Sequence, residues 1–141
     1  GQQAMTTHEP GPVITVLCVD DNADVLEVLE TILAGEPGLR CVGCAEDAEA
    51  FVALATRLRP AVAIVDLSMP GRVSALDAIA EISREVLTTR VIAHSGYDDS
   101  ASRDAAVEAG AWGFVSKHAA PEALIEAIRR VAGGEVCLLS G

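Results

Sequence analysis

The chain has 141 residues, of which 50% are hydrophobic and 22% charged, a size and composition that fit one globular domain and leave no room for a second. Its net charge of −11 and its single lysine exclude the cationic surface of a nucleic-acid-binding domain, so a DNA contact would need another domain or partner. The chain has neither a membrane-length apolar run nor the layout of a signal peptide, which predicts a cytoplasmic protein without membrane contact.

Residues 1–12 show no hydrophobic periodicity and contain both proline and glycine. The glycine that precedes Met5 is typical of residues left by an expression vector. We therefore expect a disordered tail over 1–12 and one folded domain over 13–139.

From Val13 onward, five apolar runs alternate with five longer segments of helical periodicity. The run 61–65 is apolar without alternation, as expected for a strand that is covered on both faces. Proline ends the second helix at Pro60 and opens the last one at Pro121. The predicted strands are 13–19, 39–44, 61–65, 90–94 and 112–115, and the predicted helices are 25–35, 46–58, 75–86, 98–109 and 121–132.

This alternation predicts the fold class. Strands and helices that alternate through short loops form parallel sheets with right-handed crossovers. We therefore predict a doubly wound α/β domain of three layers. In such folds, ligands bind beyond the carboxyl ends of the strands, near the point where the strand order reverses.

Polar residues follow four of the predicted strands, where each strand ends. Asp20 and Asp21 follow the first strand, Asp66 the third, Ser95 the fourth and Lys117 the fifth. In a parallel sheet all of these ends lie at one rim, so the five side chains should converge. Three carboxylates gathered there would raise one another's pKa unless a cation were present.

The residue types at this rim favour phosphoryl chemistry on an aspartate. Oxygen ligands without histidine or thiolate favour Mg²⁺, or Mn²⁺ in its place. Lys117 and the Ser95 hydroxyl can contact phosphoryl oxygens, which leaves Asp66 as the nucleophile. Each residue alone also has a structural explanation, as a helix cap for Asp20 and Asp21 or as turn chemistry for Asp66 and Ser95. Their joint convergence favours a site.

Four cysteines raise the question of a metal or a disulfide, and Cys41 and Cys44 form a C-x-x-C pair. Both fall in a predicted strand, where residues three apart point to opposite faces. We therefore expect these sulfurs neither to share an ion nor to form a bridge. The four cysteines are interpreted as small buried hydrophobic residues in a reducing compartment.

Four segments that carry these residues resemble the signature segments of response regulator receiver domains of the chemotaxis-regulator type, and the resemblance extends from Val13 to about Leu139. The segments are LCVDDN (17–22), VDLSMP (65–70), VIAHSG (91–96) and AGAWGFVSK (109–117).

The resemblance implies a flavodoxin-like fold, with a five-stranded parallel sheet in the order 2-1-3-4-5 and five helices. It also implies that a sensor histidine kinase phosphorylates Asp66. Mg²⁺ would be held by Asp21, Asp66 and the backbone carbonyl of Ser68, with Asp20 acting mainly through a water molecule.

Ser95 and Phe114 match the switch pair of the family, in which the hydroxyl moves to the phosphoryl group and the ring turns inward behind it. The alternative for Phe114 is a permanently buried core ring. Tyr97 stands where its ring could shield the phosphoryl group from water.

The segment 117–135 resembles receivers of the NarL/FixJ subfamily, whose output is a DNA-binding helix-turn-helix domain. This implies a role in transcriptional regulation. The sequence has no such output domain, so we expect either part of a longer regulator or a short regulator that acts by protein contact. A homodimer that forms on phosphorylation is a further expectation.

The chain departs from the family pattern in two places. His118 follows Lys117 where family members often have a cis proline, so the peptide should be either trans or strained cis. Ser74 stands where the family has a glycine, in a loop that is one residue longer, and we expect this loop to be shifted or mobile. Of the two histidines beside the site, we expect His94 to end a buried strand and His118 to face solvent.

The sequence thus predicts a signalling switch that catalyses only its own phosphorylation and dephosphorylation and is not a conventional enzyme. A metal-dependent phosphatase is disfavoured because Ser68 stands where such sites place a second acid. The remaining alternative is a pseudo-receiver, a protein-interaction module that acts without phosphorylation.

Overall fold

The computed structural model describes residues 12–139, and along this part of the chain strands and helices alternate. All but residue 12 of the predicted tail lies outside the described residues. The strands are β1 (Ile14–Val19), β2 (Leu39–Ala45), β3 (Val62–Asp66), β4 (Arg90–Ser95), β5 (Gly113–Ser116) and β6 (Cys137–Leu138). The helices are α1 (Ala23–Ala34), α2 (Ala48–Leu58), α3 (Ala75–Glu85), α4 (Ser100–Ala109) and α5 (Pro121–Ala132).

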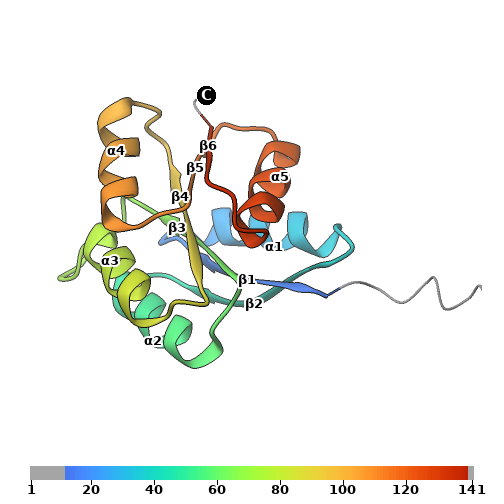
Figure 1. Cartoon of the computed structure of the whole chain (residues 1–141), viewed down its shortest axis with the longest axis horizontal. Helices are drawn as coiled ribbons and strands as arrows, with labels where there is room; N and C mark the ends of the chain where they lie inside the picture. Colours follow the sequence, from blue (N-terminus) through green and yellow to red (C-terminus); the bar gives the residue numbers. More distant parts are fainter. Residues whose placement is uncertain (1–11, 140–141) are drawn as a thin grey trace, which may run out of the picture.

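The strands form one parallel sheet in the order β2-β1-β3-β4-β5-β6 (Figure 1). The predicted order 2-1-3-4-5 is confirmed. The short strand β6 extends the sheet beside β5 and was not predicted. The strand order reverses between β1 and β3, which places the expected ligand rim at the carboxyl ends of these two strands.

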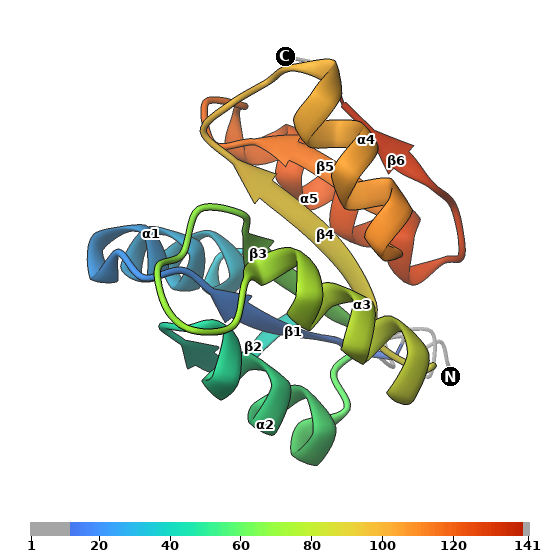
Figure 2. The ribbon, with the colours of Figure 1, turned by 90° about the vertical axis from the view of Figure 1, so that its left-hand side faces the viewer.

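Helices cover both faces of the sheet and bury a separate core on each (Figure 2). On one face, α2, α3 and α4 pack around Phe51, Ile79 and Phe114. On the other, α1 and α5 pack around Leu29, Ile64 and Ile128. Because β3 lies between the two cores, every residue of this strand is buried. The helices in the described part of the chain lack the length and hydropathy that a membrane crossing requires.

Polar residues just before the helices define where four of them begin. The side chains of Asn22, Asp47, Ser74 and Asp99 accept hydrogen bonds from backbone N–H groups in the first turns of α1, α2, α3 and α4. In α5, Pro121 occupies the first turn instead, where its missing N–H needs no partner.

The expectation that Cys41 and Cys44 point to opposite faces of β2 is wrong. β2 pairs with β1 in two registers: Val16 pairs with Cys41, but Leu17 pairs with Gly43. Val42 is therefore an extra residue, a β-bulge. Because the bulge shifts the pleat by one residue, both cysteines face the core under α1, and their Sγ atoms lie 4.0 Å apart.

The close approach of α3 and α4 depends on a glycine. Gly110 ends α4 with φ +114°, and a Cβ atom added to it would lie 2.5 Å from the Oγ and 2.7 Å from the Cβ of Ser83 in α3. Gly134 has a similar φ of +90°, but a Cβ atom added there would have nothing within 4 Å. Alanine would therefore cause backbone strain at both positions but steric overlap at Gly110 alone.

We predict that Gly110→Ala lowers the free energy of unfolding more than Gly134→Ala does. The left-handed backbone conformation should cost about 1–2 kcal/mol in both variants. Overlap with Ser83 should add about 1–3 kcal/mol in Gly110→Ala alone. Urea unfolding of the metal-free proteins measures both losses, and equal losses would contradict the steric argument.

Candidate functional site

The carboxyl ends of the central strands meet at one rim and bring the predicted polar residues together. Asp66, the last residue of β3, pairs with His94 in β4, and Ser95 pairs with Ser116 in β5. The Lys117 N–H, directly after β5, donates to the Ser95 carbonyl oxygen at 2.7 Å. Backbone pairing in the sheet thus fixes the Cα positions of these residues.

Three aspartates at this rim carry oxygen atoms that all lie within 4.8 Å of one another: Asp20, Asp21 and Asp66. Asp20 and Asp66 are buried, whereas Asp21 is exposed to solvent. Asp20 Oδ1 accepts a hydrogen bond from the Asn22 N–H at 2.9 Å, and Asp66 Oδ1 accepts one from the Ser68 N–H at 3.0 Å. Each buried carboxylate is thus oriented by the amide two residues after it.

Lys117 supplies the positive charge of the site. Its Nζ lies 2.8 Å from Asp20 Oδ2 and 3.3 Å from Asp66 Oδ1. Lys117 thus forms an ion pair with each of the two buried carboxylates. Burial lowers the pKa of Lys117, but the two aspartates outweigh it, and the net pKa is raised.

The pKa of Asp66 is raised, chiefly because the carboxyl group is buried. Burial raises it, the Ser68 amide lowers it, Asp20 raises it and Lys117 lowers it, with a net upward shift. A divalent cation would offset the negative charge of the three carboxylates. The donors are three hard carboxylate oxygens within 4.8 Å of one another, without sulfur or imidazole, so the residues fit Mg²⁺.

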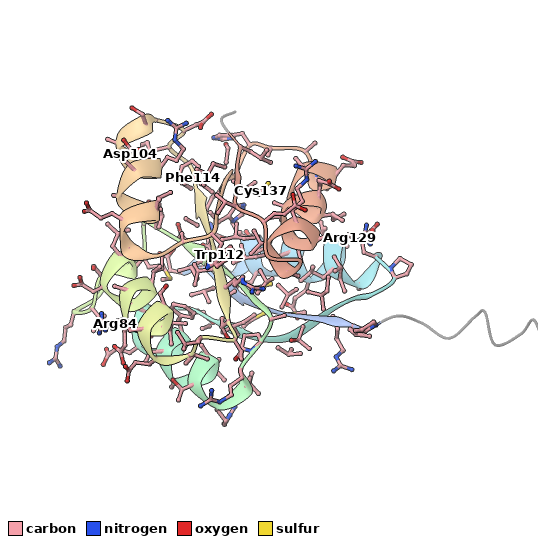
Figure 3. The ribbon with its side chains drawn as sticks, in the orientation of Figure 1. Arg84, Asp104, Trp112, Phe114, Arg129 and Cys137 are labelled. Carbon is pink, nitrogen blue, oxygen red and sulfur yellow. The ribbon has the colours of Figure 1, made fainter. Side chains whose placement is uncertain are left out.

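The predicted switch residues lie beside this centre. The Ser95 hydroxyl donates to the Tyr97 carbonyl oxygen at 2.8 Å and accepts from the Tyr97 N–H at 3.0 Å, so it is engaged by its own loop. Phe114 is fully buried on the α4 side of the sheet (Figure 3). A hollow of about 310 Å³ beside the rim is lined by Ser68, Ser95 and Tyr97, among others. The switch movement stays a prediction.

The two histidines beside the rim have the environments expected of them. His94 is buried, and burial together with the Lys117 charge lowers its pKa to about 4, so it is neutral at pH 7. His118 is exposed. No cis peptide occurs in residues 12–139, so the bond between Lys117 and His118 is trans.

Ser74, which stands where the family has a glycine, has a structural role that the sequence interpretation missed. Its Oγ accepts a hydrogen bond from the Asp77 N–H at 3.0 Å and begins α3. The pattern Ser-x-x-Asp before an apolar stripe was the signal that could have revealed it.

Comparison with known proteins identifies relatives over nearly the whole described part of the chain. The family model described as response regulator receiver domain matches residues 16–129. The nitrate/nitrite response regulator protein NarL of Escherichia coli K12 is 28% identical over 95% of this chain and 60% of its own length. NarP of the same strain is 35% identical over 84% of this chain and 55% of its own length. The chain thus spans little more than half the length of these relatives.

Among solved structures, a two-component response regulator of the LuxR family from Aurantimonas sp. SI85-9A1 superposes with a TM-score of 0.85. It is 28% identical, and the match covers 91% of this chain and 90% of that one. The sequence prediction of a NarL/FixJ-type receiver is confirmed by these relatives.

We predict that Asp66→Asn stabilises the metal-free protein at neutral pH. The pKa of Asp66 is raised from its usual 3.8 in the folded state. As pH rises from the usual value through the raised one, the folded protein retains a proton that the unfolded chain loses, so its stability falls. The variant lacks this loss, which amounts to about 1.4 kcal/mol for each unit of pKa shift.

Urea unfolding at a series of pH values, in the presence of a chelator, measures the difference between wild type and Asp66→Asn. The exposed Asp104 on α4 provides the control, because Asp104→Asn should change stability by no more than about 0.5 kcal/mol (Figure 3). A difference between wild type and Asp66→Asn that does not vary with pH would contradict the linkage.

Proposed function

Because the chain belongs to the response regulator receiver domain family, we propose that it is a phosphorylation-dependent signalling switch that accepts a phosphoryl group on Asp66. The observation that carries the proposal is the Lys117 ammonium placed 2.8 Å from Asp20 and 3.3 Å from Asp66 at the carboxyl end of the sheet. A buried nucleophilic carboxylate with a cation beside it suits the charge that develops in phosphoryl transfer.

The phosphoryl donor would be a phosphohistidine of a sensor histidine kinase. An oxygen of the Asp66 carboxylate attacks phosphorus, the P–N bond breaks as the P–O bond forms, and the imidazole leaves with its bonding electron pair. Ser68 N–H and Lys117 both contact Oδ1 of Asp66, so we assign the attack to Oδ2. Lys117 then moves from the carboxylate to a phosphoryl oxygen.

Mg²⁺, when bound, would neutralise the phosphoryl charge, and Asp20, Asp21, Asp66 and the Ser68 backbone carbonyl are its proposed ligands. Mn²⁺ offers the same coordination chemistry. Asp20 would contact the metal mainly through a water molecule, since its Oδ2 already has Lys117 as its counter-charge in this structure.

Ser95 and Phe114 would transmit the modification. The Ser95 hydroxyl exchanges its two backbone contacts with Tyr97 for one charge-assisted contact with a phosphoryl oxygen. Phe114, whose ring is fully buried on the α4 side, fills the space that this movement leaves behind. The face formed by α4, β5 and α5 would thereby change and carry the output.

Receiver domains are generally signalling modules without an external substrate, and we propose the same here. Since NarL is a response regulator of which this chain matches 60%, we also propose that the domain acts in transcriptional regulation. Homodimers that form on phosphorylation and an output domain that supplies the DNA contact would complete that role. We also propose that the protein is located in the cytoplasm.

We predict that incubation with acetyl phosphate and Mg²⁺ adds one base-labile phosphoryl group to the wild type and none to Asp66→Ala. Intact-mass spectrometry measures the adduct. Asp104→Asn, which removes an exposed carboxylate of α4, should be modified like the wild type. A folded wild-type protein that accepts no phosphoryl group from either acetyl phosphate or a phosphorylated histidine kinase would favour the pseudo-receiver.

We further predict that Tyr97→Ala shortens the lifetime of the acyl phosphate several-fold. The Tyr97 side chain is 67% exposed and lines the hollow beside Ser95, so its removal opens the phosphoryl group to water. Tyr97→Phe retains the ring and should hydrolyse at the wild-type rate. The decay of the mass adduct measures the rates, and an unchanged rate in Tyr97→Ala would rule out a shielding role.

A further inference from the structure

A second cluster of metal-ligand side chains lies on the α1 face of the sheet, at its β2 edge. Glu30 of α1 and Cys41 and Cys44 of β2 each offer one ligand atom, and these three atoms lie within 4.8 Å of one another. The two cysteines are partly exposed and Glu30 is exposed, so a cation in solution can reach them. None of these residues takes part in the proposed phosphoryl chemistry.

The bulge at Val42 creates this cluster. In a regular strand the C-x-x-C spacing separates the two sulfurs across the sheet, but here both face α1. Their separation of 4.0 Å is close to the ~3.8 Å between two thiolates that are each ~2.3 Å from a tetrahedral Zn²⁺. A disulfide of ~2.05 Å would require the sulfurs to move about 2 Å closer.

The Cys41 sulfur is held in place by its own strand. Its thiol donates to the Gly43 carbonyl oxygen at 3.4 Å, and its Sγ lies 4.0 Å from the Cys44 Sγ. A cation that binds both sulfurs would displace their protons.

We propose that Glu30, Cys41 and Cys44 form a binding site for a soft divalent cation of the Zn²⁺ type, with the fourth coordination position open to water. Two sulfur ligands select such cations against Mg²⁺, whereas the all-oxygen rim favours Mg²⁺. The chain would therefore hold two different cations in separate places. A cation in the new site would join α1 to the edge strand β2 and stabilise that side of the domain.

Cd²⁺ is the probe for this site, because its thiolate complexes absorb strongly in the ultraviolet. We expect titration of the reduced protein, with Mg²⁺ in excess to occupy the rim, to give a thiolate charge-transfer band that saturates at one Cd²⁺ per chain. Cys41→Ser and Cys44→Ser should each abolish the saturating band. Glu30→Gln should keep the band but weaken the affinity several-fold.

Cys137 provides the matched control. It is a buried cysteine of β6, at the opposite edge of the sheet from β2, and lies beside α5 (Figure 3). Cys137→Ser should leave both the band and the affinity unchanged. A band that persists when Cys41 and Cys44 are both replaced by serine, or no band in the wild type, would overturn the proposal.

A measurement on the wild type alone guards against variants that fail to fold. Alkylation of the reduced protein with iodoacetamide, followed by peptide mass spectrometry, reports the reactivity of each cysteine. We expect Zn²⁺ to slow the modification of Cys41 and Cys44 at least tenfold. Equal rates with and without Zn²⁺ would mean that the two sulfurs only pack against each other. Neither the Cd²⁺ titration nor the alkylation rates depend on phosphorylation, so they test the cation site independently of the proposed switch.

Discussion

The structure depends most on one electrostatic constraint, which is that Asp20 and Asp66 are buried within reach of a single ammonium group, that of Lys117. Removing two carboxylates from water is costly, and one cation compensates only part of that cost. The raised pKa of Asp66 reflects the part of this desolvation cost that Lys117 does not offset. The site therefore carries an excess of negative charge at the expense of the stability of the bare domain, and the proposed divalent cation would offset that excess.

The sheet makes this arrangement tolerable because it fixes the strand ends. β3 is buried on both faces, so Asp66 lies at the end of a strand that packing holds on both sides. Lys117 is tied to the end of β4 by the bond from its N–H to the Ser95 carbonyl oxygen. The backbone thus positions the charged groups, while the side chains proposed to move are held by polar contacts that can be exchanged, Ser95 by Tyr97 and Lys117 by two aspartates. A rigid scaffold with exchangeable polar contacts is what a two-state switch requires.

Much of the fold and the rim could be predicted because each depends on a repeated pattern. Five apolar runs predicted the five strands that pair as β1 to β5, and the polar residues after them predicted the rim. β6 was missed because its two residues, Cys137 and Leu138, are too few to show a period. The partners of the Ser95 hydroxyl could not be predicted from the sequence either, since local loop geometry lets it bond to both the N–H and the C=O of Tyr97.

The error over Cys41 and Cys44 has a more general cause. Strand spacing predicts facing only while the pleat is regular, and one extra residue reverses every side chain beyond it. Gly43 was the available signal, because an isolated glycine within a strand often accompanies a bulge. In β3 such an insertion would turn buried residues out of two cores at once. β2 is an edge strand that pairs with β1 alone and has partly exposed residues at its centre, so the same insertion disturbs one ladder and leaves both cores intact. An irregularity that gathers chemically reactive side chains is therefore best tolerated where it occurs here, at the edge of the sheet.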